Sequence, residues 1–234
     1  NNMLANPNIH TLLQELSDFR LDGRVVSAEC QSGFDGRLMT QEIAHLLKAA
    51  RFTSPRIAWD GPLADSQSVA EELELLRNAG YNSKDISVFM IFNHDLPPET
   101  MAAKAEQCFD WGVQVADCRY RPLNLFEDAY NPRKKTQEAG EYYLHEGWAD
   151  GDVRGFRRMI RQNNICLRYG IPKDKYRRRL EGLGRSEKRI IMSNLGIEGD
   201  RLTREQLDTL NSEWLDTSSP DGNLTELAGH RDIR

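Results

Sequence analysis

Four short polar segments hold the side chains in this chain that are best suited to bind a small molecule. Each follows an apolar run, and each contains groups that donate or accept hydrogen bonds. The segments are 31–35 (QSGFD), 60–62 (DGP), 93–95 (NHD) and 119–122 (RYRP). A few precisely placed polar groups of this kind orient a ligand in most small-molecule sites.

The charged residues Arg37 and Asp60 each allow two interpretations. The planar guanidinium of Arg37 can donate two parallel hydrogen bonds to a carboxylate of a ligand, or it can pair with Asp35 or Glu42 at the surface. Asp60 can accept a hydrogen bond from a ligand hydroxyl, or it can simply form the turn that Gly61-Pro62 favours. The residue types alone leave these interpretations open.

Asn93, His94 and Asp95 place an amide, an imidazole and a carboxylate side by side. Such groups could form a metal site or an acid–base cluster. Adjacent ligands on one turn rarely converge on a single ion, so we interpret the segment as a turn. The sequence therefore assigns no metal ligand and no catalytic residue.

The cysteines do not have the spacing of a metal centre. Cys30, Cys108, Cys118 and Cys166 are far apart, and no two of them form a CxxC or CxxxCxxC unit. Zinc and iron–sulfur sites usually need such spacing. We expect cysteines that behave as small apolar side chains, and no iron–sulfur cluster in this chain.

An alternation of strands and helices must position the polar segments. Apolar runs predict strands roughly 30 residues apart, at 25–30, 56–59, 86–92 and 113–118. Helical periodicity precedes the first strand and fills each gap, over 9–16, 40–47, 66–76 and 97–111. Parallel strands with helical crossovers follow, so we expect an α/β fold, either part of a (βα) barrel or an open sheet. Such folds bind ligands at the carboxyl ends of their strands, where the polar segments lie.

Beyond residue 130 this alternation stops. We expect a polar helix at 134–146, a helix that begins at Asp150 or Asp152, and helices at 186–195 and 203–215. The tail at 217–234 is expected to be loose. The predicted organisation is a partial barrel at 1–130, a helical extension at 131–216 and a flexible tail at 217–234.

A basic stretch at 154–179 indicates a different class of function. Arg154, Arg157, Arg158 and Arg161 recur at spacings of three and four, so a helix gathers them on one broad face. Such a face can bind phosphate backbones, but Arg-rich helices are commonly solvated or paired with acidic residues, of which this chain has 36. One alternative is therefore a non-catalytic α/β module that binds a partner or nucleic acid. Another is an iron-free enzyme with its chemistry at the same strand ends.

Three stretches resemble the C-terminal half of the barrel in radical S-adenosylmethionine (radical SAM) enzymes, and the region that follows it. They are FDGRLMTQEIAHLLKAARFTSPRIAWDGPLADSQSVAEELELLRNAGY, ISVFMIFNHDLPPET and, after the barrel, WADGDVRGFRRMIRQNNICLRYG. The order of strands, polar turns and helices is similar over roughly residues 1–170. The resemblance implies a partial, TIM-barrel-like (βα) fold with a helical C-terminal extension.

The resemblance also implies contacts with S-adenosylmethionine at the strand ends. By position, Ser32 and Arg37 would lie near the ribose or the carboxylate of the cofactor. Asp60 would accept from a ribose hydroxyl or contact the substrate, and Ile91 and Asn93 would flank the adenine. Asn2 stands before the first helix as the other polar segments stand before theirs, so it would end an earlier strand and join this set.

The family's defining CxxxCxxC motif is missing from this sequence. In the family its thiolates hold a four-iron, four-sulfur cluster, which binds S-adenosylmethionine and cleaves it reductively to start radical chemistry. We therefore expect this chain to be the C-terminal part of such an enzyme, inactive alone and acting on an unknown substrate when intact. The first predicted strand would then be an open edge that could pair with a second copy.

Composition agrees with a globular protein. The 234 residues are 39% hydrophobic and 29% charged, with a formal net charge of −5. The longest apolar run, at 86–92, is far shorter than the ~20 residues of a membrane span. We expect a cytoplasmic protein without membrane contact.

Overall fold

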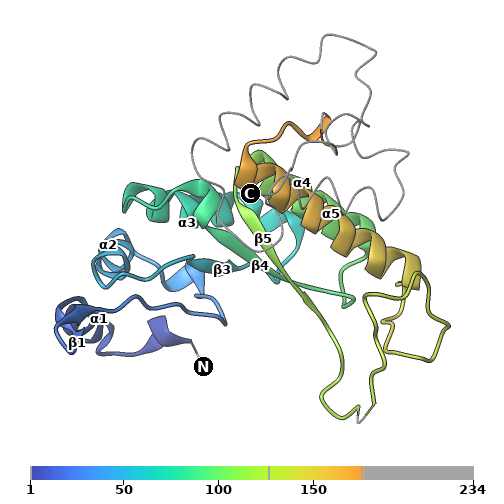
Figure 1. The fold of residues 1–234 in the computed structure, drawn as a ribbon, viewed down its shortest axis with the longest axis horizontal. Coiled ribbons are helices and arrows are strands. Elements are labelled where there is room, and N and C mark those ends of the chain that lie inside the picture. The colour runs from blue at the N-terminus through green and yellow to red at the C-terminus, as the bar shows by residue number, and fades with distance from the viewer. Residues whose placement is uncertain (1, 126, 175, 177–234) are drawn as a thin grey trace, which may run out of the picture. The chain divides into compact units, whose positions relative to one another are not determined.

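A three-stranded parallel sheet forms the centre of the computed structural model (Figure 1), which describes residues 2–125, 127–174 and 176. Its strands are β3 (Arg56–Ala58), β4 (Ser87–Phe92) and β5 (Gln114–Arg119), in the order β3-β4-β5. In the register, Ser87 lies opposite Arg56 on one side and Gln114 on the other. Three of the four predicted strands and the predicted α/β class are thus confirmed.

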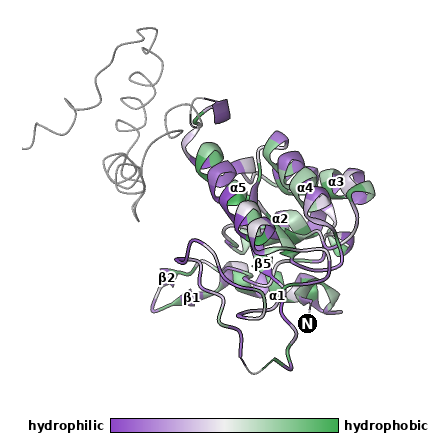
Figure 2. Cartoon of the chain, turned by 90° about the vertical axis from the view of Figure 1, so that its right-hand side faces the viewer, coloured by the Kyte–Doolittle hydropathy of each residue, from purple (hydrophilic) through white to green (hydrophobic). Residues whose placement is uncertain are grey.

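Helices cover one face of this sheet. The crossovers α3 (Ser66–Asn78) and α4 (Pro98–Asp110) join the strands, and α5 (Asp150–Tyr169) follows β5 after a long loop (Figure 1). Figure 2 shows hydrophilic and hydrophobic residues mixed along these helices, and their buried apolar residues recur every three or four positions, which gives each helix an apolar stripe. The stripes meet the buried side chains of alternate strand residues, namely Ile57, Val88, Met90, Phe92 and Val115.

The other face of the sheet is more open. Ala58, Phe89, Ile91 and Ala116 are half-buried there, and Cys118 is exposed. The described strands form an open sheet and do not close into a barrel. The predicted α/β class with a parallel sheet is therefore confirmed, whereas the partial barrel stays a prediction.

The N-terminal part contains α1 (Ile9–Asp18), a two-stranded antiparallel hairpin of β1 (Arg20–Leu21) and β2 (Arg24–Val25), and α2 (Gln41–Ala49). The predicted strand at 25–30 is wrong, because Val25 pairs back within the hairpin. Asp22 and Gly23 both have positive φ, of 49° and 73°, which is the geometry of a tight hairpin turn. Beyond Val25 the chain makes isolated parallel bridges, from Ala28 to Phe52 and from Phe34 to Ile57.

Those bridges join the 28–34 segment to β3 and the residues before it, so they lie on the side opposite the predicted open edge. The Ala28 N–H donates to the Arg51 carbonyl, and the Ala28 carbonyl accepts from the Thr53 N–H. At the other side of the sheet, the Asn164 side chain of α5 accepts from the Val115 N–H at 2.9 Å and donates to the Val115 carbonyl at 2.8 Å. Edge-mediated dimerisation stays a prediction.

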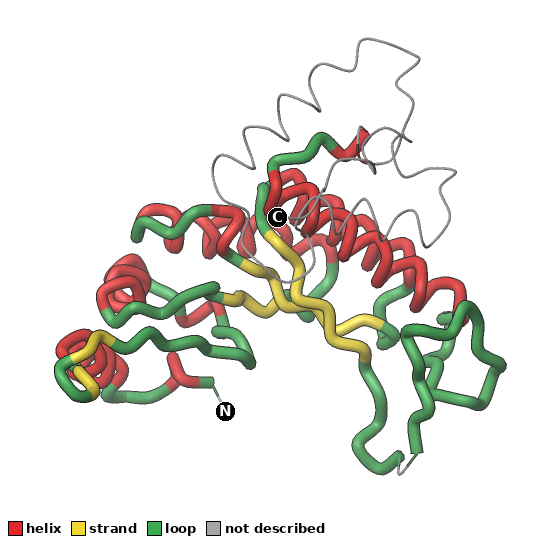
Figure 3. The backbone as a smooth tube through the Cα atoms, in the orientation of Figure 1, coloured by secondary structure: helices red, strands yellow, loops and turns green. Residues whose placement is uncertain are grey.

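The helix predicted at 134–146 is also wrong, since the chain between β5 and α5 is loop throughout its described residues (Figure 3). Within that range, Gly140 adopts a positive φ of 96°, which the interior of a helix does not allow. Buried Tyr142 and Trp148 anchor the loop, and Arg154 of α5 donates to the Lys134 carbonyl. The predicted helices at 186–195 and 203–215 and the tail at 217–234 lie outside the described residues.

The remaining helices are single 3₁₀ turns: η1 (Met3–Ala5), η2 (Gly36–Leu38), η3 (Leu63–Asp65) and η4 (Ser83–Asp85). The chain divides into two compact units, Asn1–Arg168 and Tyr169–Arg234. Among the described residues, no helix has the length and apolar character needed to cross a membrane. Cys108 and Cys166 are buried, whereas Cys30 is half-buried and Cys118 is exposed.

Candidate functional site

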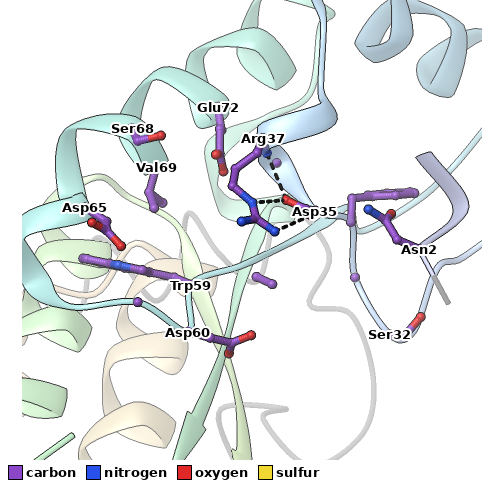
Figure 4. Close-up of a pocket in the computed structure, with 15 residues that line it drawn as sticks. Asn2, Ser32, Asp35, Arg37, Trp59, Asp60, Asp65, Ser68, Val69 and Glu72 are labelled. Atoms are coloured by element: carbon purple, nitrogen blue, oxygen red, sulfur yellow. Dashed lines mark hydrogen bonds and ion pairs between the residues drawn. The ribbon is translucent and has the colours of Figure 1, made fainter. Parts of the chain in front are cut away.

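A cavity of about 690 Å³ opens beside the carboxyl end of β3 (Figure 4). Three segments build it: the 32–37 loop with η2, the 58–61 end of β3, and the first two turns of α3. Asn2 adds its side chain from the residue before η1. The lining residues are Asn2, Ser32, Gly33, Phe34, Asp35, Gly36, Arg37, Ala58, Trp59, Asp60, Gly61, Asp65, Ser68, Val69 and Glu72.

Four of the six predicted ligand-binding residues therefore meet in one cavity. Asn2, Ser32, Arg37 and Asp60 all line it. The 32–37 loop reaches β3 because Gly33, at φ 79°, turns so closely that a Cβ would lie 3.3 Å from the Arg56 carbonyl oxygen. The Phe34 N–H then donates to that carbonyl at 2.7 Å, which fixes the loop to the strand.

Arg37 pairs with Asp35. Its Nε donates to Oδ1 of Asp35 at 2.8 Å and its Nη2 donates to Oδ2 at 2.7 Å. The hydrogen bonds from Arg37 hold the pKa of Asp35 below its usual value, and this carboxylate also caps η2. The side chain of Arg37 is 82% exposed. One of the two interpretations of Arg37, a pair with Asp35, is thus what the structure contains.

Lys104 supports the turn that carries Asp60. It is fully buried, and its Nζ donates to the carbonyls of Trp59 at 2.8 Å and Gly61 at 2.7 Å. The ammonium also lies 4.7 Å from the centre of the Trp59 ring. Burial lowers the pKa of Lys104 to about 8. Lys104 of α4 therefore fixes the backbone of this turn, while Asp60 itself stays exposed at the cavity.

Two glycines leave space for two carboxylates at the wall of the cavity. A Cβ on Gly36 would lie 1.8 Å from Oε2 of Glu72, and a Cβ on Gly61 would lie 2.0 Å from Oδ2 of Asp65. Both glycines leave room that no other residue would leave. The carboxylates of α3 and of its N-terminal cap therefore pack directly against the two loops.

The cavity is predominantly acidic. Asp35, Asp60, Asp65 and Glu72 line it, against a single cationic lining residue, Arg37. Glu72 is 8% exposed, and burial, followed by the charge of Asp35, raises its pKa to about 7. Such a lining attracts cations and can accept hydrogen bonds from hydroxyl groups.

Ile91 and Asn93 lie outside this cavity. Ile91 is on the open face of the sheet, opposite Cys118 in the register. Asn93 is fully buried at φ 58°, and its amide donates to the carbonyls of Tyr120 and Tyr143. The structure does not bring these two predicted residues together with the other four.

A second polar cluster surrounds the end of β4. Asp95 lies 3.5 Å from Nδ1 of His94 and 3.5 Å from Nε2 of His145, and Tyr143 Oη lies 2.9 Å from Nδ1 of His145. His94 also stacks edge-on against Tyr120, with ring centres 4.1 Å apart. The sequence analysis considered His94 and Asp95 and interpreted their segment as a turn, but it missed His145, which comes from the loop before α5. Within the described residues, no three His, Cys, Asp or Glu side chains are placed to hold a metal ion.

Part of the basic face of α5 forms ion pairs with acidic residues of the same chain. Arg154 pairs with Asp150 at 2.8 Å, and Arg157 pairs with Asp117 at 3.1 Å. Arg158 and Arg161 remain exposed. Two of the four predicted phosphate-binding arginines therefore have structural partners.

No protein-family model, curated protein or solved structure matches the chain.

Proposed function

We propose that the acidic cavity beside β3 binds S-adenosylmethionine, and that the chain is the cofactor-binding side of a radical SAM enzyme with a partial (βα) barrel. The observation that carries this proposal is the convergence of Asn2, Ser32, Arg37 and Asp60 on one cavity. The cavity lies at the carboxyl end of a parallel strand, where α/β folds bind ligands.

The cavity suits this cofactor in size and in charge. Its volume of about 690 Å³ lies within the range of sites for drug-sized molecules. Asp60 offers an exposed carboxylate to the ribose hydroxyls, and Ser32 adds a hydroxyl. The acidic lining favours a ligand that carries a sulfonium and an ammonium group.

The described cysteines do not fit an iron–sulfur cluster. Cys108 and Cys166 are buried, Cys30 and Cys118 lie in separate segments, and no described group of ligands could hold a metal ion. In this proposal the chain binds and orients S-adenosylmethionine in the cytoplasm, and it is inactive alone.

Calorimetric titration of the full chain with S-adenosylmethionine tests this proposal. We expect saturable binding, weakened several-fold by Asp60→Asn and by Ser32→Ala, because each removes a group that contacts the ribose side of the ligand. Asp110→Asn is the control, since Asp110 is exposed at the end of α4 and is not a lining residue. The proposal fails if S-adenosylmethionine does not bind, or if all three variants bind it equally.

A further inference from the structure

Glu72 is a largely buried residue whose carboxylate has no hydrogen-bond partner among the described residues and remains accessible from the cavity. Its side chain lies at the cavity wall, pressed against Gly36, and points toward Arg37 and Asp35 (Figure 4). Only 8% of the residue is exposed. Removal from water disfavours the ionised form of an unpaired carboxylate, so the place of Glu72 at a cavity points to a cationic ligand group as its partner.

The neighbouring charged side chains do not form a hydrogen bond with the Glu72 carboxylate. The Arg37 guanidinium directs two donors to Asp35, at 2.8 Å and 2.7 Å. The charge of Asp35, from the 32–37 loop, disfavours the ionised form of Glu72 more than the charge of Arg37 favours it. Asp65 and Asp60 add two further carboxylates on the α3 and β3 sides of the cavity. The site therefore has an excess of negative charge that a cationic ligand would balance.

We infer that Glu72 is the residue that recognises the positive charge of the ligand, and that the ionised form of Glu72 binds a sulfonium or ammonium group within the cavity. This inference deepens the proposed function, because S-adenosylmethionine carries a sulfonium. Gly36 makes the recognition possible, since any side chain there would occupy the space of the Glu72 carboxylate.

A pair of nucleosides isolates the charge from the rest of the ligand. The sulfonium 5′-dimethylthioadenosine and the neutral thioether 5′-methylthioadenosine differ by one methyl group and one permanent charge, and neither carries an amine that titrates near neutral pH. We expect the sulfonium to bind up to about tenfold more tightly at pH 8 than at pH 6, because the ionised fraction of an acid with a midpoint near 7 changes by this factor. The thioether should show no such change.

Two matched variants assign the effect to one residue. Glu72→Gln should remove the pH dependence and the preference for the sulfonium. Glu71→Gln should keep both, since Glu71 is exposed on the same turn of α3 and is not a lining residue. Carboxyl-¹³C NMR of glutamate-labelled chain, assigned by Glu72→Gln, follows the titration of Glu72 directly. The sulfonium should shift its midpoint to lower pH.

The same NMR titration with trimethylsulfonium chloride separates this inference from the proposed function. If trimethylsulfonium shifts the Glu72 titration but neither nucleoside binds, the inference holds and the proposal for S-adenosylmethionine fails. If both nucleosides bind equally at both pH values, the cavity binds the nucleoside and the inference is overturned. It is also overturned if the Glu72 titration responds to neither cation more than to sodium chloride of equal concentration.

Discussion

Asn93 Oδ1 accepts a hydrogen bond from the backbone N–H of His145 at 3.0 Å, which joins the end of β4 to a loop 52 residues further along the chain. The amide nitrogen of Asn93 donates to the carbonyls of Tyr120 and Tyr143 at 3.2 Å and 3.1 Å. One buried side chain thus satisfies three backbone groups from two other segments. Asn93 holds the loop before α5 to the sheet.

Asn93→Asp should destabilise the protein more than Asn93→Gly. The aspartate would keep the acceptor for His145 but would face two carbonyl oxygens with a buried carboxylate, at a cost above about 3 kcal/mol. The glycine suits the positive φ and loses only the hydrogen bonds, at about 1–3 kcal/mol. Urea unfolding at pH 7 measures both. Asn8→Asp, at the exposed start of α1, is the control and should change stability by less than about 0.5 kcal/mol. The reverse order of the two Asn93 variants would contradict this role.

Lys104→Met should destabilise the protein, because the carbonyls of Trp59 and Gly61 would lose their buried donor at about 1–3 kcal/mol. Burial holds the pKa of Lys104 at about 8, below the usual 10.5, so the unfolded chain binds more protons than the folded chain between these values. The stability of the natural chain relative to Lys104→Met should therefore increase from pH 8 to pH 10. Denaturant unfolding at the two pH values, with exposed Lys84→Met as control, measures the difference. An advantage that shrinks with pH would show that Lys104 is not held in this way.

The sequence predicts those residues of the site that follow the ends of predicted strands. Ser32 and Asp60 follow apolar runs, and neighbouring parallel segments bring such residues to the same edge, so their convergence could be expected. Glu72 and Lys104 were missed, although each stands on an apolar stripe: Glu72 lies three residues after Val69, and Lys104 lies three residues after Met101. A charged residue at an apolar position of a predicted helix is the sequence feature that could have identified both.

Other features depend on contacts that no local pattern contains. Apolar residues at 25–30 resemble a strand, but the Asp22-Gly23 turn folds the chain back on itself, so that Val25 pairs with Arg20 in the hairpin. The cluster around Asp95 needs His145, whose position follows from the Asn93 anchor rather than from its own sequence neighbours. Periodicity cannot report such long-range placement.

Glu72→Gln should stabilise the protein more at pH 8 than at pH 5. The pKa of Glu72 is raised from 4.5 to about 7, mainly by burial, so the folded chain binds more protons than the unfolded chain between these values. The natural chain therefore loses stability as the pH rises through this window, whereas a neutral glutamine does not. Thermal unfolding at the two pH values should show a gain from Glu72→Gln that is about 1–3 kcal/mol larger at pH 8 than at pH 5. An equal gain from the exposed Glu71→Gln would mean that general surface charge is responsible.

Anaerobic reconstitution of the full chain with iron and sulfide should give no four-iron cluster. The cysteines lack the spacing that such clusters need, and the described ones do not converge. Iron analysis and visible absorption after gel filtration measure the outcome, and the same treatment of Cys118→Ser should give an indistinguishable result. About four irons per chain, with a broad charge-transfer band that Cys118→Ser removes, would contradict the prediction.

Gly36→Ala should destabilise the protein and displace the Glu72 carboxylate. The new Cβ would lie 1.8 Å from Oε2 of Glu72, so the carboxylate must move, at a cost of about 1–3 kcal/mol for the overpacked contact. Truncating the opposing side chain should relieve this cost: Gly36→Ala should be nearly neutral when it is made in Glu72→Ala, which a double-mutant cycle of urea unfolding measures. Gly155→Ala is the control, because a Cβ there meets nothing within 4 Å and alanine suits the interior of α5, so it should stabilise by about 0.5–1 kcal/mol. An equal cost of Gly36→Ala with and without the Glu72 side chain would show that the two residues do not share this space.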